Sequence, residues 1–346
     1  MATFNVTTNS DSGAGSLRDA ITQANAKTDT DTIKFNTSVK SIQLNSVLNI
    51  TNSVNIIGNG TANTTVTGKS TFDTFAVQKG TVTFQKLTVT KGNDNVDITG
   101  NSTKVTLTDV VLSTAADDGF DLSGNTNTVT LDKVVSKTNT ETGVEIDGDS
   151  NKLTIKNSEL SGNKSKDGAL FLDADGTKNT VTVTGGKIAT SVDDGVDIDS
   201  NSNTLTFTNV KIESNKDDGI SIDGNTNKVT FSGGSFSKNT SDGVELKGNN
   251  NTLTISKATF SGNGGKNTND LGTGNKITIS SLEADSLLGN MELNAGTAEA
   301  VAFGATSAVE EPIVLSRDQF LGSTNVVVAE DQDPLASILV AVSPDF

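Results

Sequence analysis

An asparagine recurs every 24 residues through the middle of this chain, with a single interval of 28. The repeated positions are Asn127, Asn151, Asn179, Asn203, Asn227, Asn251 and Asn275. Each is followed two residues later by an apolar-Thr-apolar triplet. Fixed self-similarity in this range is typical of solenoids, in which stacked repeats share one continuous core. The 346 residues are therefore expected to form one elongated domain instead of two or three ordinary ones.

Each repeat contains three short runs in which apolar and polar residues alternate, separated by Gly and Asn. Runs this short and this rich in threonine predict strands and not helices. Three strands per repeat predict an all-β chain, a triangular parallel β-helix (solenoid) of about 24 residues per rung. The aligned rungs begin near Val96, Phe120, Val144, Ala169, Val196, Ile220 and Val244.

Strand alternation predicts which side chains leave the core. In the run after each asparagine, the apolar pair faces inward and the threonine between them faces out. The expected exterior column is Thr106, Thr130, Thr154, Thr182, Thr206, Thr230, Thr254 and Thr278. The preceding run places Asp97, Asp121, Glu145, Asp197 and Glu245 outward, with Ser221 interrupting. The asparagine itself is expected to bond to its equivalent on the next rung and to satisfy turn groups that the sheets leave unpaired.

Both ends of the chain differ from the repeat. Residues 1–30 contain a strand and a helix that begins after Ser16 and places Leu17 and Ile21 on one face, which suits a cap over the open core. Residues 31–280 form the β-helix, and residues 281–346 form a non-repeat cap, assembly or export segment. This last segment holds all three prolines, a possible helix start at Ser316 and apolar runs at Val326–Val328 and Ile338–Val342.

The N-terminal motif carries a family resemblance. Gly-Ser-Leu-Arg-x-Ala-Ile begins at Gly15 and is followed by Asp31–Phe35 and Ile56–Gly60. These segments resemble the entry region of pectate-lyase-like bacterial surface and exported proteins. In that family the motif forms a capping helix before a right-handed parallel β-helix. The resemblance implies that fold and an extracellular or cell-surface location. It leaves function open, because the family includes adhesins, autotransporter passengers and carbohydrate-active enzymes.

Composition excludes several classes of function. The formal charge of -16 disfavours nucleic acid, which needs a Lys/Arg surface that releases counterions. The sequence has no Cys, His, Trp or Tyr, so disulfides and thiolate or imidazole metal ligands are excluded. No apolar run reaches membrane-spanning length, and no N-terminal signal peptide is visible, so membrane insertion is not expected and export would use another route.

Paired aspartates raise the question of an enzyme. Asp193-Asp194-Gly195 and Asp217-Asp218-Gly219 look like the acid pairs of glycoside hydrolases. Lyases on this fold resemble one another in using an Arg or Lys as the base, but the repeats contain no arginine. The acidic turn also recurs at Asp117-Asp118, so it is a feature of the rung and not a singular active site. The sequence therefore predicts a non-enzymatic protein.

The recurring carboxylates favour two interpretations. Charges on neighbouring rungs, about 4.8 Å apart, repel by roughly 1 kcal/mol even in water. Calcium would relieve this repulsion, since it binds clustered oxygen ligands. The candidate metal ligands are Asp117, Asp118, Asp121, Asp193, Asp194, Asp197, Asp217 and Asp218. The alternative is a solvated acidic surface that keeps the rod from aggregating. No cofactor other than calcium is predicted.

The threonine column resembles the arrays of ice-binding solenoids, but threonine is also common on exposed strands, and lysines such as Lys104, Lys152 and Lys228 interrupt the array. The rod ends offer unpaired backbone groups. Thr3–Thr7 and Ser337–Ser343 could cap them or pair with a neighbouring molecule, which would give a head-to-tail homopolymer.

The predicted function is that of a non-enzymatic extracellular rod, structural or adhesive, with a bacterial surface or matrix as its partner. The alternative is a calcium- or ice-binding β-solenoid, and a polysaccharide-active enzyme is less favoured. The interval of 28 residues between Asn151 and Asn179 stands out in this scheme. Its extra residues, around Ala174 to Lys178, should bulge from the rod and form the best candidate for a non-repetitive feature.

Overall fold

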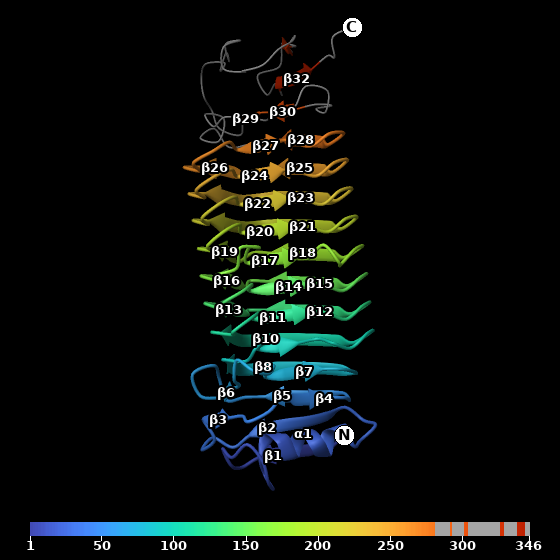
Figure 1. The fold of residues 1–346 in the computed structure, drawn as a ribbon, viewed down its shortest axis with the longest axis vertical. Coiled ribbons are helices and arrows are strands. Elements are labelled where there is room, and N and C mark those ends of the chain that lie inside the picture. Colours follow the sequence, from blue (N-terminus) through green and yellow to red (C-terminus); the bar gives the residue numbers. More distant parts are fainter. Residues whose placement is uncertain (281–290, 293–300, 304–325, 329–337, 343–346) are drawn as a thin grey trace.

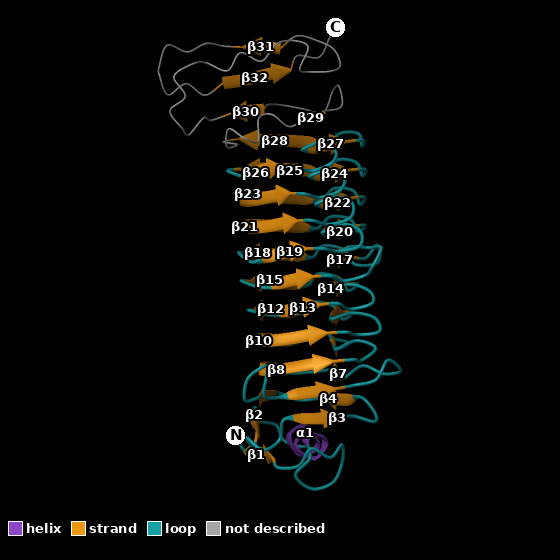
Figure 2. Ribbon diagram, turned by 90° about the vertical axis from the view of Figure 1, so that its left-hand side faces the viewer, coloured by secondary structure: helices purple, strands orange, loops and turns teal. Residues whose placement is uncertain are grey.

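Parallel strands stack rung upon rung along one axis, so the chain forms a rod with three faces (Figure 1). The computed structural model describes residues 1–280, 291–292, 301–303, 326–328 and 338–342. One short helix lies at the N-terminal end, and the described remainder consists of strands and turns (Figure 2). The all-β, parallel β-helical architecture predicted from the repeat is confirmed.

The first face, called the acidic face after its carboxylates, is an eleven-stranded sheet. Its described members pair in parallel from one rung to the next. In order they are β4 (Leu48–Ile50), β7 (Phe75–Val77), β9 (Val96–Asp97), β11 (Phe120–Leu122), β14 (Val144–Ile146), β17 (Leu170–Leu172), β20 (Val196–Ile198), β22 (Ile220–Ile222), β24 (Val244–Leu246), β27 (Thr268–Asp270) and β29 (Met291–Glu292).

The other two faces share one continuous sheet, because four long strands run around the corner between them. These are β8 (Thr81–Thr90), β10 (Lys104–Ser113), β21 (Thr204–Glu213) and β23 (Lys228–Ser237). The threonine face adds β1 (Thr3–Val6), β2 (Asp31–Phe35), β5 (Val54–Ile57), β12 (Thr128–Asp132), β15 (Lys152–Lys156), β18 (Thr180–Thr184), β25 (Thr252–Ser256) and β28 (Lys276–Ser280). The third face adds β3 (Ser41–Gln43), β6 (Thr65–Thr67), β13 (Val135–Lys137), β16 (Glu159–Ser161), β19 (Lys187–Ala189) and β26 (Thr259–Ser261).

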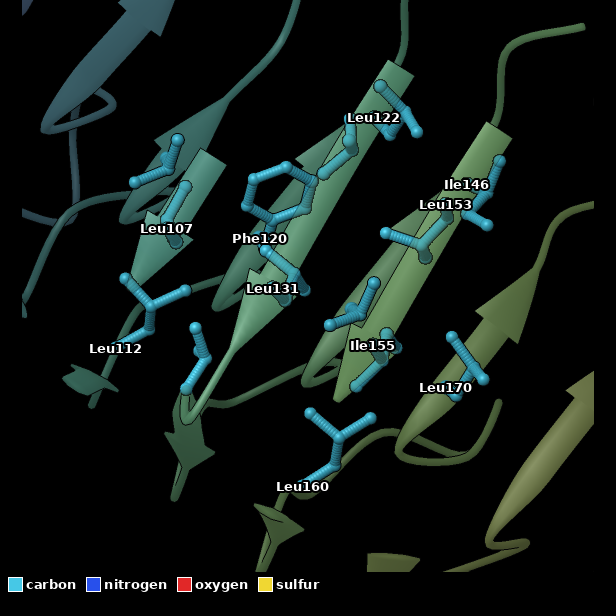
Figure 3. Close-up of a cluster of buried hydrophobic side chains, with 14 of the residues drawn as sticks. Leu107, Leu112, Phe120, Leu122, Leu131, Ile146, Leu153, Ile155, Leu160 and Leu170 are labelled. Carbon is cyan, nitrogen blue, oxygen red and sulfur yellow. The ribbon is translucent and has the colours of Figure 1, made fainter. Parts of the chain in front are cut away.

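The core runs the length of the rod and is filled by the inward residues of all three faces. Leu107, Leu131 and Ile155 occupy the same place on successive strands of the threonine face and are buried. Figure 3 shows them beside Phe120 and Leu122 of the acidic face. The predicted inward pairs are therefore confirmed, and each rung buries its apolar side chains only against its neighbours, as in other solenoids.

An asparagine ladder closes the corner between the acidic and threonine faces. The Oδ1 atom of Asn151 accepts a hydrogen bond from the backbone N–H of Asn127 at 2.7 Å, and Asn179 accepts one from Asn151 at 2.7 Å. The side-chain amide of Asn151 also donates to the carbonyl of Gly124 at 2.9 Å. The predicted role is confirmed in refined form, because each side chain bonds to the backbone of the rung before it.

The irregular interval consists of two small insertions, one before β17 and one after it. Asn139 and Asn163, which are bonded to each other, lie 24 residues apart. The paired residues Val144 and Leu170 lie 26 apart, and the bonded pair Asn151 and Asn179 lies 28 apart. Two residues are therefore added before the strand and two after it. The rung begins at Leu170, so the start at Ala169 predicted from the repeat is wrong by one residue, because the first insertion shifts the register.

Helix α1 (Leu17–Asn25) caps the N-terminal end as predicted. Ser16 accepts a hydrogen bond from the backbone of Asp19 at 3.1 Å, which satisfies a free N–H of the first turn. Leu17 and Ile21 are buried against the core. The side chain of Arg18 pairs with Asp11 at 2.7 Å and also bonds to the backbone before β4, which ties the cap to the rod.

Short strands are described within the C-terminal segment. β30 (Val301–Phe303), β31 (Val326–Val328) and β32 (Ile338–Val342) pair in antiparallel fashion, so both predicted apolar runs are strands. The possible helix start at Ser316 and most of 281–346 lie outside the described residues. Within the described part of the chain, no helix is both long enough and apolar enough to cross a membrane.

Replacing Asn151 by Ala tests the ladder. The change removes two buried hydrogen bonds and leaves the N–H of Asn127 and the carbonyl of Gly124 without partners. We expect the free energy of unfolding to fall by about 2–3 kcal/mol, measured by urea denaturation with circular dichroism. Asn125→Ala is the matched control, because Asn125 makes the same kind of bond to Asp149 at an exposed position where water can replace it. Equal losses in the two variants would contradict the ladder's role.

Candidate functional site on the acidic face

Carboxylates form columns along the acidic face. The outward residue in the middle of each strand stands in register with that of the next rung. This mid-strand column runs through Asp97, Asp121, Glu145, Phe171, Asp197, Ser221 and Glu245. The predicted outward acids are confirmed, and Phe171 is an aromatic interruption that the sequence alignment did not place. A second column follows the strands and holds Asp147, Asp173, Asp199, Asp223 and Lys247.

The turn that leads into the acidic face contains a second ladder, built from aspartates. The Oδ1 atom of Asp94 accepts the backbone N–H of Asp118 at 2.9 Å. In the same way, Asp194 accepts from Asp218 and Asp218 from Asp242, at 2.7 and 2.6 Å. These carboxylates thus satisfy corner backbone groups, as the asparagines do at the other corner. Their side chains are buried, with only 4% of Asp118 and 6% of Asp194 exposed. These two carboxylates therefore do not belong to a solvated acidic surface, which was the alternative to calcium binding.

Burial and mutual repulsion favour the protonated form of these groups. Desolvation, reinforced by Asp218, raises the pKa of Asp194 to about 8. Desolvation, reinforced by Asp199 and Asp194, raises the pKa of Asp197 to about 9. Burial and a hydrogen bond to Asp118 raise the pKa of Glu145 to about 12. The face is therefore short of positive charge and keeps protons that exposed carboxyls would release.

Four groups of three carboxylates come within 4.8 Å of one another in the described part of the chain. They are Asp73-Asp94-Asp97, Asp94-Asp117-Asp118, Glu145-Asp147-Asp173 and Asp193-Asp194-Asp217. Each has the oxygen chemistry that a divalent cation prefers. All four lie on the acidic face or in the turn before it.

The structure brings some of the predicted metal ligands together and not others. Asp117 and Asp118 share a group, as do Asp193, Asp194 and Asp217. The other three candidates, Asp121, Asp197 and Asp218, belong to none of the four groups found among the described residues. The sequence analysis did not select the remaining members of these groups, which are Asp73, Asp94, Asp97, Glu145, Asp147 and Asp173. Only correct alignment across the irregular rung would have placed Asp173 beside Glu145.

A cleft of about 350 Å³ opens on the acidic face at the irregular rung. Its lining residues are Asp117, Glu141, Thr142, Glu145, Ser165, Asp167, Phe171, Asp173 and Asp199. Asp167 and Asp173 come from the two turns that carry the insertions. The non-repetitive feature was expected around Ala174 to Lys178, but none of these residues lines the cleft, which lies instead over the turn before β17, Phe171 and Asp173.

Lys247 follows β24, near the C-terminal end of the acidic face. The Nζ atom of Lys247 lies 3.0 Å from a carboxylate oxygen of Glu245 and 3.4 Å from one of Asp223, and it donates to the Ser221 hydroxyl at 3.2 Å. Although burial acts in the opposite direction, these partners raise the pKa of Lys247 and keep it charged. The chain therefore supplies its own cation at this rung.

The threonine face shows the predicted column in register. Thr106 pairs with Thr130, and the pairing continues through every predicted member to Thr278. In the neighbouring column, however, Lys104 stands beside Thr128 and Lys152 follows it, so charged side chains interrupt the threonines. Binding of ice by this face stays a prediction.

Comparison with known proteins supports the fold. Residues 165–283 match the family model described as the right handed beta helix region, which agrees with the pectate-lyase-like resemblance and its handedness. No curated protein of similar sequence was found.

Three solved structures are similar at low sequence identity. A protein of Geobacillus virus E2, ORF18, is 14% identical with a TM-score of 0.60, over 88% of this chain and 61% of that one. A periplasmic alginate epimerase is 12% identical with a TM-score of 0.55, over 73% and 71% of the two chains. The Dettilon tailspike protein is 10% identical with a TM-score of 0.54, over 85% and 65%. The chain thus spans less than two thirds of the viral protein and of the tailspike, and the likeness establishes the fold alone.

The buried carboxyls predict that stability depends on pH. The pKa values of Asp94 and Asp194 are about 8 and that of Asp197 about 9, against 3.8 for an ordinary aspartate. The folded chain thus holds protons that the unfolded chain releases near pH 4, so stability is full below that pH and is lost as the pH rises through 8 to 9.

We expect the melting temperature, measured in a chelator at constant ionic strength, to fall steadily from pH 5 to 9.5. Asp197→Asn should flatten the curve, because it removes one of these titrating groups. A melting temperature that is constant or rises across this range would contradict the assignment.

Proposed function

We propose that this protein is a non-enzymatic rod of a bacterial surface or matrix that binds a polysaccharide chain along its acidic face. The observation that carries the proposal is the cleft at the irregular rung. Between Asn127 and Asn275 the repeat breaks once, and the cleft lies at that break. A site that selects one ligand needs such a local departure, because identical rungs offer identical surfaces.

The lining of the cleft suits the hydroxyl groups of sugars. Glu141 and Asp167 are half-buried acceptors, and Ser165 adds a hydroxyl that already bonds to Asp167 at 3.1 Å. Carboxylates accept hydrogen bonds from several donors at once, which neutral sugars supply in number. A volume of about 350 Å³ is that of a small-ligand site, so the cleft would hold one sugar unit or two while the chain continues along the face.

The name of one structural neighbour supports a polysaccharide ligand. The periplasmic alginate epimerase shares the fold, and alginate is a polysaccharide. The protein would bind the polysaccharide without cleaving it, for a chemical reason specific to this chain. Glycoside hydrolysis needs a carboxylic acid that can deliver its proton to the substrate. In this cleft, burial and a hydrogen bond to the buried Asp118 raise the pKa of Glu145 to about 12, which disfavours release of its proton to a substrate.

Paired charge-neutral substitutions test the site. Glu141→Gln with Asp167→Asn removes two acceptor charges from the cleft without touching either ladder. Affinity electrophoresis of the unmodified chain over a panel of neutral and uronic polymers identifies the polysaccharide that it binds most tightly. For that polysaccharide we expect the double variant to lose at least tenfold in affinity. Asp132→Asn with Glu213→Gln makes the same charge change on the other two faces and should leave binding intact.

Two outcomes would contradict the proposal. Retention of none of the polymers, or equal retention by both double variants, would remove the cleft as a binding site. Appearance of shorter products or new reducing ends during incubation would replace binding by cleavage.

The rod form suits a spacer that holds the binding face away from a cell or within a matrix. Addition of one rod to the end of another stays a prediction from the sequence. Negative-stain microscopy of the purified chain tests it, since head-to-tail addition would give filaments and its absence would give short single rods.

A further inference from the structure

The position of Lys247 shows where a cation sits on the acidic face. Its ammonium group bonds to a mid-strand residue, Ser221, and to Asp223 at the end of the same strand. Lys247 itself occupies the equivalent strand-end place on the next rung, since Ser221 and Ile222 pair with Glu245 and Leu246. One rung, its neighbour and the cation between them thus form a defined unit.

The same three places are filled by carboxylates at the irregular rung. Glu145 is the mid-strand residue of β14, Asp147 follows the strand, and Asp173 follows the next one. The register is secure, because Glu145 and Ile146 pair with Phe171 and Leu172. Asp173 therefore stands where Lys247 would be. The oxygens of Glu145, Asp147 and Asp173 come within 4.8 Å of one another with no ammonium between them.

Carboxylate oxygens in this region lack partners. The Oδ1 atom of Asp147 is buried without a hydrogen bond. Asp197, two rungs further along the mid-strand column, is only 9% exposed, and its Oδ1 atom also lacks a partner. The charge that acts most strongly on Asp197 is Asp199, which lines the cleft together with Glu145 and Asp173. On the acidic face Lys247 forms ion pairs with Asp223 and Glu245.

We infer that a divalent cation, calcium, binds to Glu145, Asp147 and Asp173, in a place equivalent to the one that the ammonium group of Lys247 fills nearer the C-terminal end of the face. Calcium accepts six to eight oxygen ligands in flexible geometry, and the open cleft leaves room for water to complete the set. Magnesium requires stricter octahedral geometry and gives up its water reluctantly, so we expect it to bind more weakly than calcium at this site. This site does not depend on polysaccharide binding.

A lysine placed in the cluster provides the sharpest test. Asp173→Lys would reproduce the arrangement of Lys247 and replace the ion by a covalently attached cation. Calcium alone is titrated into the full chain by calorimetry after treatment with a chelator. The unmodified chain should bind calcium more tightly than magnesium, and Asp173→Lys should bind one calcium ion fewer per chain. Its melting temperature should also become less sensitive to chelator.

Asp175→Lys is the matched control. It makes the same charge reversal two residues away, at an exposed position outside the cluster, and should bind as many ions as the unmodified chain. Asp147→Asn serves as a second variant of nearly unchanged shape, and it too should lose one ion, even where the lysine variant folds poorly.

Three results would overturn the inference. The first is absence of calcium binding by the unmodified chain, which would leave a shared proton as the only link between the carboxyls. The second is an equal number of bound ions in Asp173→Lys and Asp175→Lys. The third is an unchanged number of bound ions in Asp147→Asn. Because no polysaccharide is present, none of these results bears on the binding of polymers.

Discussion

The hydrogen bond from a backbone N–H at a corner to a side-chain oxygen one rung away is the interaction on which this rod depends. Within each face the strands pair with one another, but the residues between faces have no strand to pair with, and a buried N–H left unpaired costs about 1–3 kcal/mol. Asn151 and Asn179 supply the missing acceptor at one corner, and Asp94 and Asp194 do so at another. The bond forms only if equivalent residues recur with the rung, and for this reason the period is visible in the sequence.

Using aspartate instead of asparagine at one corner has electrostatic consequences. Both side chains offer the same acceptor oxygen, but the carboxylate adds a charge that is buried beside the charges of neighbouring rungs. The raised pKa values of Asp94 and Asp194 follow from this arrangement. A structural device thus creates a face that attracts protons or cations. Lys247 meets that demand at one rung, whereas no lysine in the described part of the chain forms an ion pair with Glu145, Asp147 or Asp173 at the irregular rung.

The repetitive part of the structure could be predicted from the sequence, and the non-repetitive part could not. The inward pairs, the threonine column and the ladder through Asn151 follow from strand alternation and one period, both of which are local rules. Phe171 and Asp173 were missed, because two insertions change the register by amounts that only the pairing of β17 with its neighbours reveals. The acidic turns were recognised as recurring, but their burial could not be seen, since an Asp that accepts a backbone hydrogen bond reads in sequence like an Asp in solvent.

The two insertions flanking β17 explain how a repeat protein can acquire a singular site without losing its core. Leu170 and Leu172 keep their places in the sheet, so the apolar stack of the acidic face continues through the irregular rung. The added residues enter only the turns, where the chain can lengthen without breaking a ladder of strands. The first insertion contributes Asp167 to the wall of the cleft, beside Asp173, which keeps its regular place at the end of the strand. Because every other rung in this part of the repeat must match its neighbours, a departure confined to the turns is the one change that adds chemistry at little cost to stability.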